Sequence, residues 1–328
     1  MIMFWISVLA SALLLYVLLD GFDLGVGMLY LFARNDEQRH AMHAAVSPVW
    51  DGNETWLVIA GTVMFGAFPR AYAVMLSAFY LPVIVMVCGL ILRGVAFEFA
   101  HKARQSKAFW DAVFGWGSIA ATFAQGTMLG ALVETIPVVN HQYAGPPLGW
   151  ATPFALLCGL GLCVGYALLG SSWLIAKCEG RIRSAGYRIS AWLIVALALE
   201  FLSVFGYALS QRLEILRRWV QLPWMAAFPA IGLCGIGMLI WGLRGRKDLL
   251  PIVGSMIFFI AAFATFLVSF WPYMIPFSMT IEGAASPSSS LAFMFWGAGL
   301  LAFPLTLVYT AMVYRIFRGK VVTSSEYD

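Results

Sequence analysis

The sequence predicts an all-α polytopic membrane protein with about nine transmembrane helices, and two observations carry this prediction. Apolar residues make up 62% of the 328 residues and charged residues only 11%, whereas soluble proteins carry about 25% charged residues. The apolar residues also gather in windows long enough to cross a bilayer. No linker divides the chain, so residues 1–328 are expected to form a single transmembrane domain. The net charge of +4, without a basic tract, gives no reason to expect a nucleic-acid partner.

The apolar windows define the predicted helices in chain order. The second window is short because Pro69 ends it, although this helix could extend back to the Asp51 region. The predicted spans are Phe4–Phe32, Thr55–Phe68, Ala71–Phe99, Trp110–Val133, Pro153–Ala176, Tyr187–Leu209, Trp224–Leu243, Leu250–Trp271 and Leu291–Phe317.

The basic residues of the connections predict the orientation in the membrane, because cytoplasmic loops carry an excess of Lys and Arg. One side of the predicted topology carries only Arg70, Arg212, Arg217 and Arg218. The N-terminus is therefore expected outside the bacterial cytoplasmic (inner) membrane and the C-terminus in the cytoplasm, as an odd number of spans requires. The other side carries Arg34, Arg39, Lys102, Arg104, Lys107, Lys177, Arg181, Arg183, Arg188, Arg244, Arg246, Lys247, Arg315, Arg318 and Lys320.

The basic stretch Gln211–Trp219 does not fit this rule, because it falls on the outer side. Its leucines and arginines would lie on opposite faces of a short interfacial amphipathic helix. A miscounted transmembrane helix is the alternative explanation.

The first apolar span contains two carboxylates and two closely spaced glycines. Asp20 and Asp23 are three residues apart, so both project from one side of a helix, while Gly21 and Gly25 form a small pair that favours a close neighbouring helix. A carboxylate in hydrocarbon costs roughly 2.5–3.5 kcal/mol, so a functional site is the default hypothesis. Alternatively, the span ends near Asp20 and both acids lie at the headgroup level.

Two further acidic stretches flank later spans. Asp51 and Glu54 precede Trp56 at the start of the second span, where acids also suit a helix N-terminus and Trp is a common interface anchor. Arg93 and Glu98 lie near the end of the third span. There Arg93 requires a carboxylate partner, from its own helix, such as Glu98, or from a neighbouring helix, or else it snorkels to the interface. Five charged residues of the first three spans map to the cytoplasmic half: Asp20, Asp23, Asp51, Arg93 and Glu98. That position suits proton uptake from the cytoplasm, and chance clustering of interface residues is the competing explanation.

None of the four histidines falls inside a predicted span, where a haem-binding helical bundle would need an axial ligand. His40 and His43 are in a connection, His101 is at a helix end and His141 is in an outer connection. This chain alone is therefore expected to bind no haem.

Several motifs are familiar as a set. The specific ones are Asp20–Met28, Arg34–Asp36, Trp50–Leu57, Phe79–Tyr80 and Arg93–Glu98, with looser likeness at Pro153–Phe154, Glu179–Gly180 and Val308–Thr310. Together they resemble subunit II of the cytochrome bd-type quinol oxidases, over most of the chain. The cyanide-insensitive branch of that family shares these motifs.

The resemblance implies a subunit of a membrane-bound terminal oxidase of aerobic respiration, which oxidises quinol, reduces oxygen to water and generates a proton-motive force. It implies a fold of two four-helix bundles plus one further helix, and a heterodimer with a haem-bearing subunit I. The haems, of the b and d types, would belong to that partner, with no cofactor bound by this chain. The family picture also allows a small single-helix subunit, membrane lipids and a structural quinone or lipid as further partners.

The family's proposed proton route from the cytoplasm uses acids at the subunit interface. The positions of this sequence that match it are Asp20, Asp23, Asp51 and Glu98, with Arg93, Glu54 and Trp56 in supporting positions and Gly21 and Gly25 in helix packing. This chain departs from longer members by a brief outer connection between Leu209 and Trp224.

Two other functions remain open from the sequence. A secondary transporter would use intramembrane carboxylates to bind H⁺ or Na⁺, usually between two repeats with interrupted helices. The acids concentrate before residue 100, which disfavours that hypothesis. A purely structural assembly subunit would need no proton relay at all.

Overall fold

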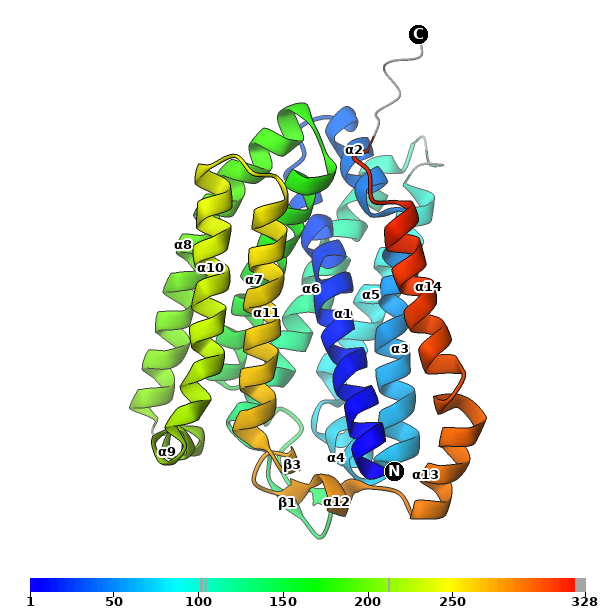
Figure 1. Cartoon of the computed structure of the whole chain (residues 1–328), viewed down its shortest axis with the longest axis vertical. Helices are drawn as coiled ribbons and strands as arrows, with labels where there is room; N and C mark the ends of the chain where they lie inside the picture. Colours follow the sequence, from blue (N-terminus) through cyan, green and yellow to red (C-terminus); the bar gives the residue numbers. More distant parts are fainter. Residues whose placement is uncertain (101–102, 104, 212, 322–328) are drawn as a thin grey trace.

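The computed structural model describes residues 1–100, 103, 105–211 and 213–321, and it is a bundle of long helices that run along one axis (Figure 1). The helices are α1 Ile2–Tyr30, α2 Asp36–Val46, α3 Trp50–Ala67, α4 Pro69–Ala78, α5 Tyr80–Phe99, α6 Lys107–Val133, α7 Pro153–Lys177, α8 Gly180–Ser210, α9 Glu214–Gln221, α10 Ala227–Arg244, α11 Leu249–Phe270, α12 Ile281–Ala284, α13 Ser288–Met294 and α14 Ala302–Ile316. A 3₁₀ turn, Pro223–Ala226, precedes α10, and a π-helical segment, Phe295–Gly299, follows α13. Two short antiparallel hairpins complete the described part: β1 Val138–Val139 with β2 Gln142–Tyr143, and β3 Tyr273–Ile275 with β4 Met279–Thr280.

The first bundle consists of α1, α3, α5 and α6, with α1 against α3 and α6, and α5 against α6. Helix α1 also packs closely on α7, because its small residues admit the α7 backbone. A Cβ atom added at Gly25 would lie 1.8 Å from the carbonyl oxygen of Tyr166. One added at Gly21 would lie 2.9 Å from the Tyr166 ring. Both glycines therefore face α7, and any larger residue at Gly25 must push the two helices apart.

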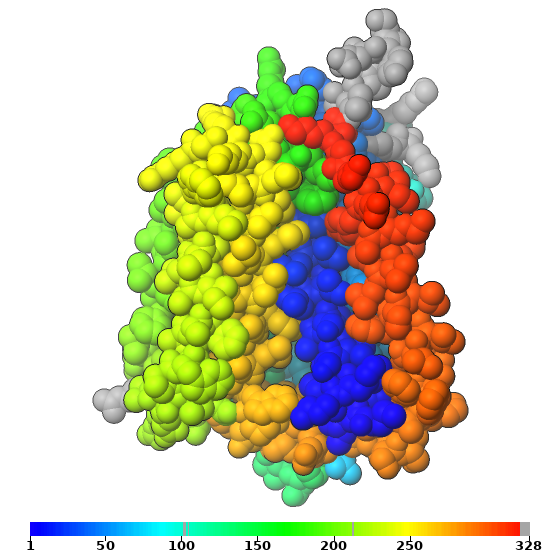
Figure 2. Space-filling model, viewed as in Figure 1, coloured from blue at the N-terminus to red at the C-terminus, as the bar shows by residue number. Residues whose placement is uncertain are grey.

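The second bundle consists of α7, α8, α10 and α11, in which each helix contacts two others. Glycines also set its closest approach: Gly235 of α10 and Gly254 of α11 each lie against the carbonyl oxygen of the other. The remaining segment, α13 to α14, packs beside α1 and α3, where the Trp5 indole donates a 3.0 Å hydrogen bond to the Leu291 carbonyl. Figure 2 shows α1 at the surface between α11 and this segment.

The prediction of about nine helices in two four-helix bundles plus one is confirmed. Seven helices of the described residues are long and apolar enough to cross a membrane, or eight if α3 and α4 count as one broken span. Helix α6 supplies the remaining one in 27 residues, and its lower hydropathy comes from polar side chains turned into the protein. Those buried side chains are Ser118, Thr122, Gln125 and Thr127.

The extension of the second span back to the Asp51 region is confirmed, because α3 runs from Trp50 to Ala67. The predicted third span is wrong. The predicted single span Ala71–Phe99 is two helices, α4 and α5, which separate at Phe79, and α4 meets the preceding helix α3 at a bend of 117°. Pro69 causes the bend, because it cannot continue α3 but suits the first turn of α4. The second break, at Phe79, comes three residues before Pro82, which has no N–H to donate and lies in the first turn of α5. Likewise, the last span is interrupted by the π-helical segment.

The outer connection predicted to hold a short amphipathic helix contains α9, followed by the 3₁₀ turn. Arg212, Lys102, Arg104 and His101, which the sequence predictions use, lie outside the described residues. The start of α1 and the end of α14 are at opposite ends of the bundle (Figure 1), as an odd number of crossings requires.

Candidate functional site

Arg93 of α5 is the centre of the candidate site, with 2% of its side chain exposed. Its Nη1 atom lies 2.8 Å from Asp20 Oδ1 of α1, and its Nη2 atom lies 2.9 Å from Glu54 Oε2 of α3. The guanidinium group therefore ties three helices of the first bundle together. Because Arg93 is enclosed and paired, it does not snorkel to the membrane interface.

Asp23 joins this group through Asn53, the fourth residue of α3. The Asn53 Nδ2 atom donates a 2.7 Å hydrogen bond to Asp23 Oδ2 and a weaker one, at 3.3 Å, to the Leu19 carbonyl. From the other side, the Tyr314 hydroxyl of α14 donates to Asn53 Oδ1 at 2.9 Å. We name Asp20, Asp23, Asn53, Glu54 and Arg93 the arginine cluster.

The arginine cluster holds more negative than positive groups. Three carboxyl groups share one guanidinium, and Asp20 and Asp23 are 0% and 2% exposed. Asp20 Oδ2 and Asp23 Oδ1 have no hydrogen-bond partner within the described chain. An uncompensated buried carboxylate is costly, so a carboxyl group in this position favours a bound proton or a donor. The cluster is therefore chemically suited to take up and release protons.

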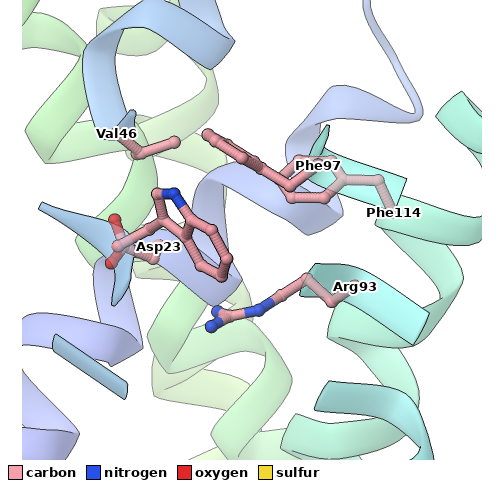
Figure 3. A pocket seen from close by; sticks show the side chains of 6 residues that line it. Asp23, Val46, Arg93, Phe97 and Phe114 are labelled. Atoms are coloured by element: carbon pink, nitrogen blue, oxygen red, sulfur yellow. The ribbon is translucent and has the colours of Figure 1, made fainter. Parts of the chain in front are cut away.

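A small cavity adjoins the cluster, with Asp23 and Arg93 reaching it from different helices and Phe97 and Phe114 beside them (Figure 3). Val46 and Trp50 complete its lining. The Phe97 ring stacks on His43 of α2, with ring centroids 3.7 Å apart. The cavity thus lies between the cluster and the end of the bundle that carries α2.

A second buried network was not predicted from the sequence. The Gln125 Nε2 atom of α6 donates to the Tyr16 hydroxyl at 2.7 Å, and the Tyr166 hydroxyl of α7 donates weakly to Gln125 Oε1 at 3.5 Å. Tyr16 lies four residues before Asp20, on the same face of α1. These neutral side chains extend the polar interior from Asp20 toward α7.

The structure separates the predicted site residues into two groups. Asp20, Asp23, Glu54 and Arg93 come together in the cluster, whereas Asp51 and Glu98 are exposed. Trp56 is fully buried in α3 against the Phe303 ring, so it is not an interface anchor. Asp20 and Asp23 lie within α1, which continues to Tyr30, and both side chains are enclosed by protein.

The described residues offer no histidine inside a membrane-crossing helix. His40 and His43 are on α2, and His141 is in the turn between β1 and β2. Nor does any group of three or more His, Cys, Asp or Glu side chains in the described part suit a metal ion.

Two ion-pair groups lie at the end of the bundle, outside the spans. A hydrogen bond and the charge of Lys107, aided by Arg39, hold the pKa of Asp36 below its ordinary value. Burial raises the pKa of Asp248, but hydrogen bonds from Lys320, Tyr187 and Arg183 outweigh burial and hold it below its ordinary value. Asp248 thereby joins α8, the start of α11 and the C-terminal tail.

Comparison with known proteins gives a consistent result. The chain is 28% identical to "Cytochrome bd-I ubiquinol oxidase subunit 2" of Escherichia coli K12, over 97% of this chain and 94% of that protein. It is also 28% identical to "Cytochrome bd ubiquinol oxidase subunit 2" of Bacillus subtilis, over 97% and 96%. In fold it is similar to a chain of the bd oxidase from Geobacillus thermodenitrificans, with a TM-score of 0.77, 17% identity and 97% coverage of both chains. The model of the family "Cytochrome bd terminal oxidase subunit II" matches residues 1–317. The chain therefore belongs to the cytochrome bd terminal oxidase subunit II family.

Proposed function

We propose that this chain is the haem-free subunit II of a membrane-bound quinol:oxygen oxidoreductase, that it stabilises a haem-bearing subunit I, and that it delivers protons from the cytoplasm for the reduction of oxygen to water. Membership of the family makes it a subunit of a respiratory quinol oxidase. That membership favours the oxidase over the transporter hypothesis. The partner's haems, of the b and d types, would supply the redox chemistry. This chain's residues would supply and hold protons.

The observation that carries the proton role is the composition of the arginine cluster. Full ionisation of Asp20, Asp23 and Glu54 would leave two negative charges beyond the one that Arg93 neutralises. In a buried site such an excess is relieved by protonation. Asp20 and Glu54 each hold one end of the guanidinium, whereas Asp23 accepts only a neutral amide hydrogen bond. Asp23 is therefore the carboxyl group that best holds an exchangeable proton.

The two exposed acids, Asp51 and Glu98, suit an earlier step of proton delivery to the arginine cluster. Asp51 is in the first turn of α3, two residues before Asn53, and Glu98 is at the end of α5. Carboxylates at these positions can collect protons from the aqueous side and pass them to water near the cluster. The basic connections at this end of the bundle support a cytoplasmic position for it under the positive-inside rule.

Asp23→Asn tests the proton role, because it removes the ionisable group and keeps its size. In the intact complex we expect quinol-driven oxygen consumption per haem to fall about 100-fold, the usual scale for loss of a positioned proton-transfer group. Haem content should stay unchanged. Asp36→Asn is the matched control, since Asp36 forms only exposed ion pairs at the end of the bundle.

Asp51→Asn provides a second test at an exposed position, where folding is not at stake. It should slow proton uptake in reconstituted vesicles while leaving haem content intact. If both variants keep wild-type oxygen consumption and proton uptake, this chain does not deliver protons and its role is structural. If Asp23→Asn alone loses the haem, Asp23 is needed for assembly, and Asp51→Asn then decides the proton role.

A further inference from the structure

A second small cavity lies between α3 and α14. It is lined by Gly52 and Asn53 of α3 and by Thr310 and Tyr314 of α14, among others. Thr310 and Tyr314 are four residues apart, so they share one face of α14. We name this space the outer cavity, and the one lined by Asp23 and Arg93 the inner cavity.

Both cavities suit water by size and by lining. Each has a volume of about 10 Å³, at the lower limit of what one water molecule requires. The residues that line them include buried polar atoms without a partner in the described chain. Those atoms are Asp23 Oδ1 and Arg93 Nε at the inner cavity and Thr310 Oγ1 at the outer one. Buried polar groups are normally hydrogen-bonded, and a water molecule would satisfy them.

Asn53 links one lining residue of each cavity. Its amide accepts a hydrogen bond from Tyr314 on the outer side and donates one to Asp23 on the inner side. A side-chain amide holds its N–H protons tightly, so Asn53 can position its neighbours but is a poor carrier of protons. Any transfer between the cavities therefore passes through water beside a displaced Asn53 side chain.

We propose that the two cavities are binding sites for water, and that this water connects the outer cavity, between α3 and α14, to Asp23, with Asn53 as the movable divider. This inference rests on the proposed proton role of the arginine cluster and adds its route. Water in the outer cavity accepts a proton and passes it to water in the inner cavity when the Asn53 side chain turns aside. The inner water then gives the proton to Asp23 Oδ1, forming its O–H bond, and both water molecules return to the neutral state.

The test follows hydrogen–deuterium exchange of the protonated Asp23 carboxyl in the purified intact complex. Its infrared carbonyl band is identified by its loss in Asp23→Asn, and the probe is D₂O itself. Thr310→Val removes the outer hydroxyl at constant size, and Gly52→Ala adds a methyl group to the wall of the outer cavity. Each should slow the exchange about tenfold, the rate change that corresponds to one lost hydrogen bond.

Two matched controls should leave the exchange unchanged. Thr306→Val is the same substitution one turn earlier on α14, where the hydroxyl bonds to the Ala302 carbonyl. Gly61→Ala is on α3, where an added Cβ meets no atom within 4 Å. Gly52→Ala also favours the helix, so slower exchange in that variant does not arise from unfolding.

The outcomes separate the route from the proposed function. If Thr310→Val and Gly52→Ala exchange as fast as wild type, the route through the outer cavity is wrong. If no carbonyl band depends on Asp23, Asp23 is not the proton acceptor and the inference falls. If exchange slows as expected while Asp23→Asn keeps full oxygen consumption, the water route stands and the proton-delivery function does not.

Discussion

The two helical bundles bury different kinds of polar group. The first encloses Asp20, Asp23 and Arg93, with the amides of Asn53 and Gln125. The fully buried polar residues of the second are serines, such as Ser171 and Ser190, whose hydroxyls lie 2.8 Å apart. Glu200 of α8 is the partial exception, with one buried oxygen and some exposure. Close packing alone thus does not require charge, and the first bundle's ionisable interior calls for a functional explanation.

Among substitutions that test this comparison of the two bundles, removal of the Arg93 charge should reduce the yield of intact complex most. Arg93→Met leaves the buried Asp20 and the partly exposed Glu54 without their cation, and breaking a buried pair such as Arg93–Asp20 costs about 3–5 kcal/mol. We expect the yield of intact complex on native gels to collapse. The triple variant with Asp20→Asn and Glu54→Gln should restore much of it, because neutral groups need no counter-charge. Normal yield of Arg93→Met alone would show that the ion pairs are not needed to hold the first bundle together.

The contact between the bundles should be the next most sensitive place. Gly25→Leu puts a large side chain where even a Cβ would lie 1.8 Å from the Tyr166 oxygen. Overpacking of this kind typically costs about 1–3 kcal/mol, and more where only backbone can move. The thermal midpoint and yield of the complex should both fall, whereas Gly61→Leu on α3 should change neither. Unchanged stability of Gly25→Leu would mean that α1 and α7 can separate without loss.

The smallest change in stability is expected at Asp248, which forms ion pairs near the surface, at one end of the second bundle. Its pKa is lowered in the folded protein, so its stabilising contribution is present above the ordinary carboxyl pKa and is lost as the pH falls through the lower folded value. Asp248→Asn should lower stability by about 0.2–1 kcal/mol at neutral pH. Thermal unfolding of both proteins at falling pH should show this difference vanish. If the difference in stability between Asp248→Asn and wild type persists at low pH, the effect comes from packing and not from the charge of Asp248.

The charged members of the cluster were predictable because charge in an apolar span is conspicuous. Asn53 and Tyr314 were not, since neutral side chains do not stand out and the two are 261 residues apart in sequence. The sequence also offered Glu98 as a partner for Arg93. A helix turns roughly 100° per residue, so a residue five positions on faces well away, and the partners come instead from α1 and α3.

The fold was predictable to the level of helix number but not of helix direction. Apolar composition reports that a segment can lie in a membrane, and it says nothing about a turn inside an apolar run. The bend and the break each lie close to a proline, Pro69 and Pro82, but a proline in an apolar span can equally kink a helix that continues. The two β hairpins are too short to produce an alternating pattern.

The last helix has a consequence for the way this protein is made. No residue of α14 is fully buried, and its tail is held by Lys177, which donates to the Phe317 and Gly319 carbonyls, and by Val321, whose N–H donates to the Lys177 carbonyl. Tyr314 and Thr310 nevertheless form one wall of the space beside Asn53. The charged interior of α1, α3 and α5 can therefore assemble before α14 is made, but it is closed only once α14 has packed beside it. Premature termination would leave a chain with the acids in place and the wall beside them missing.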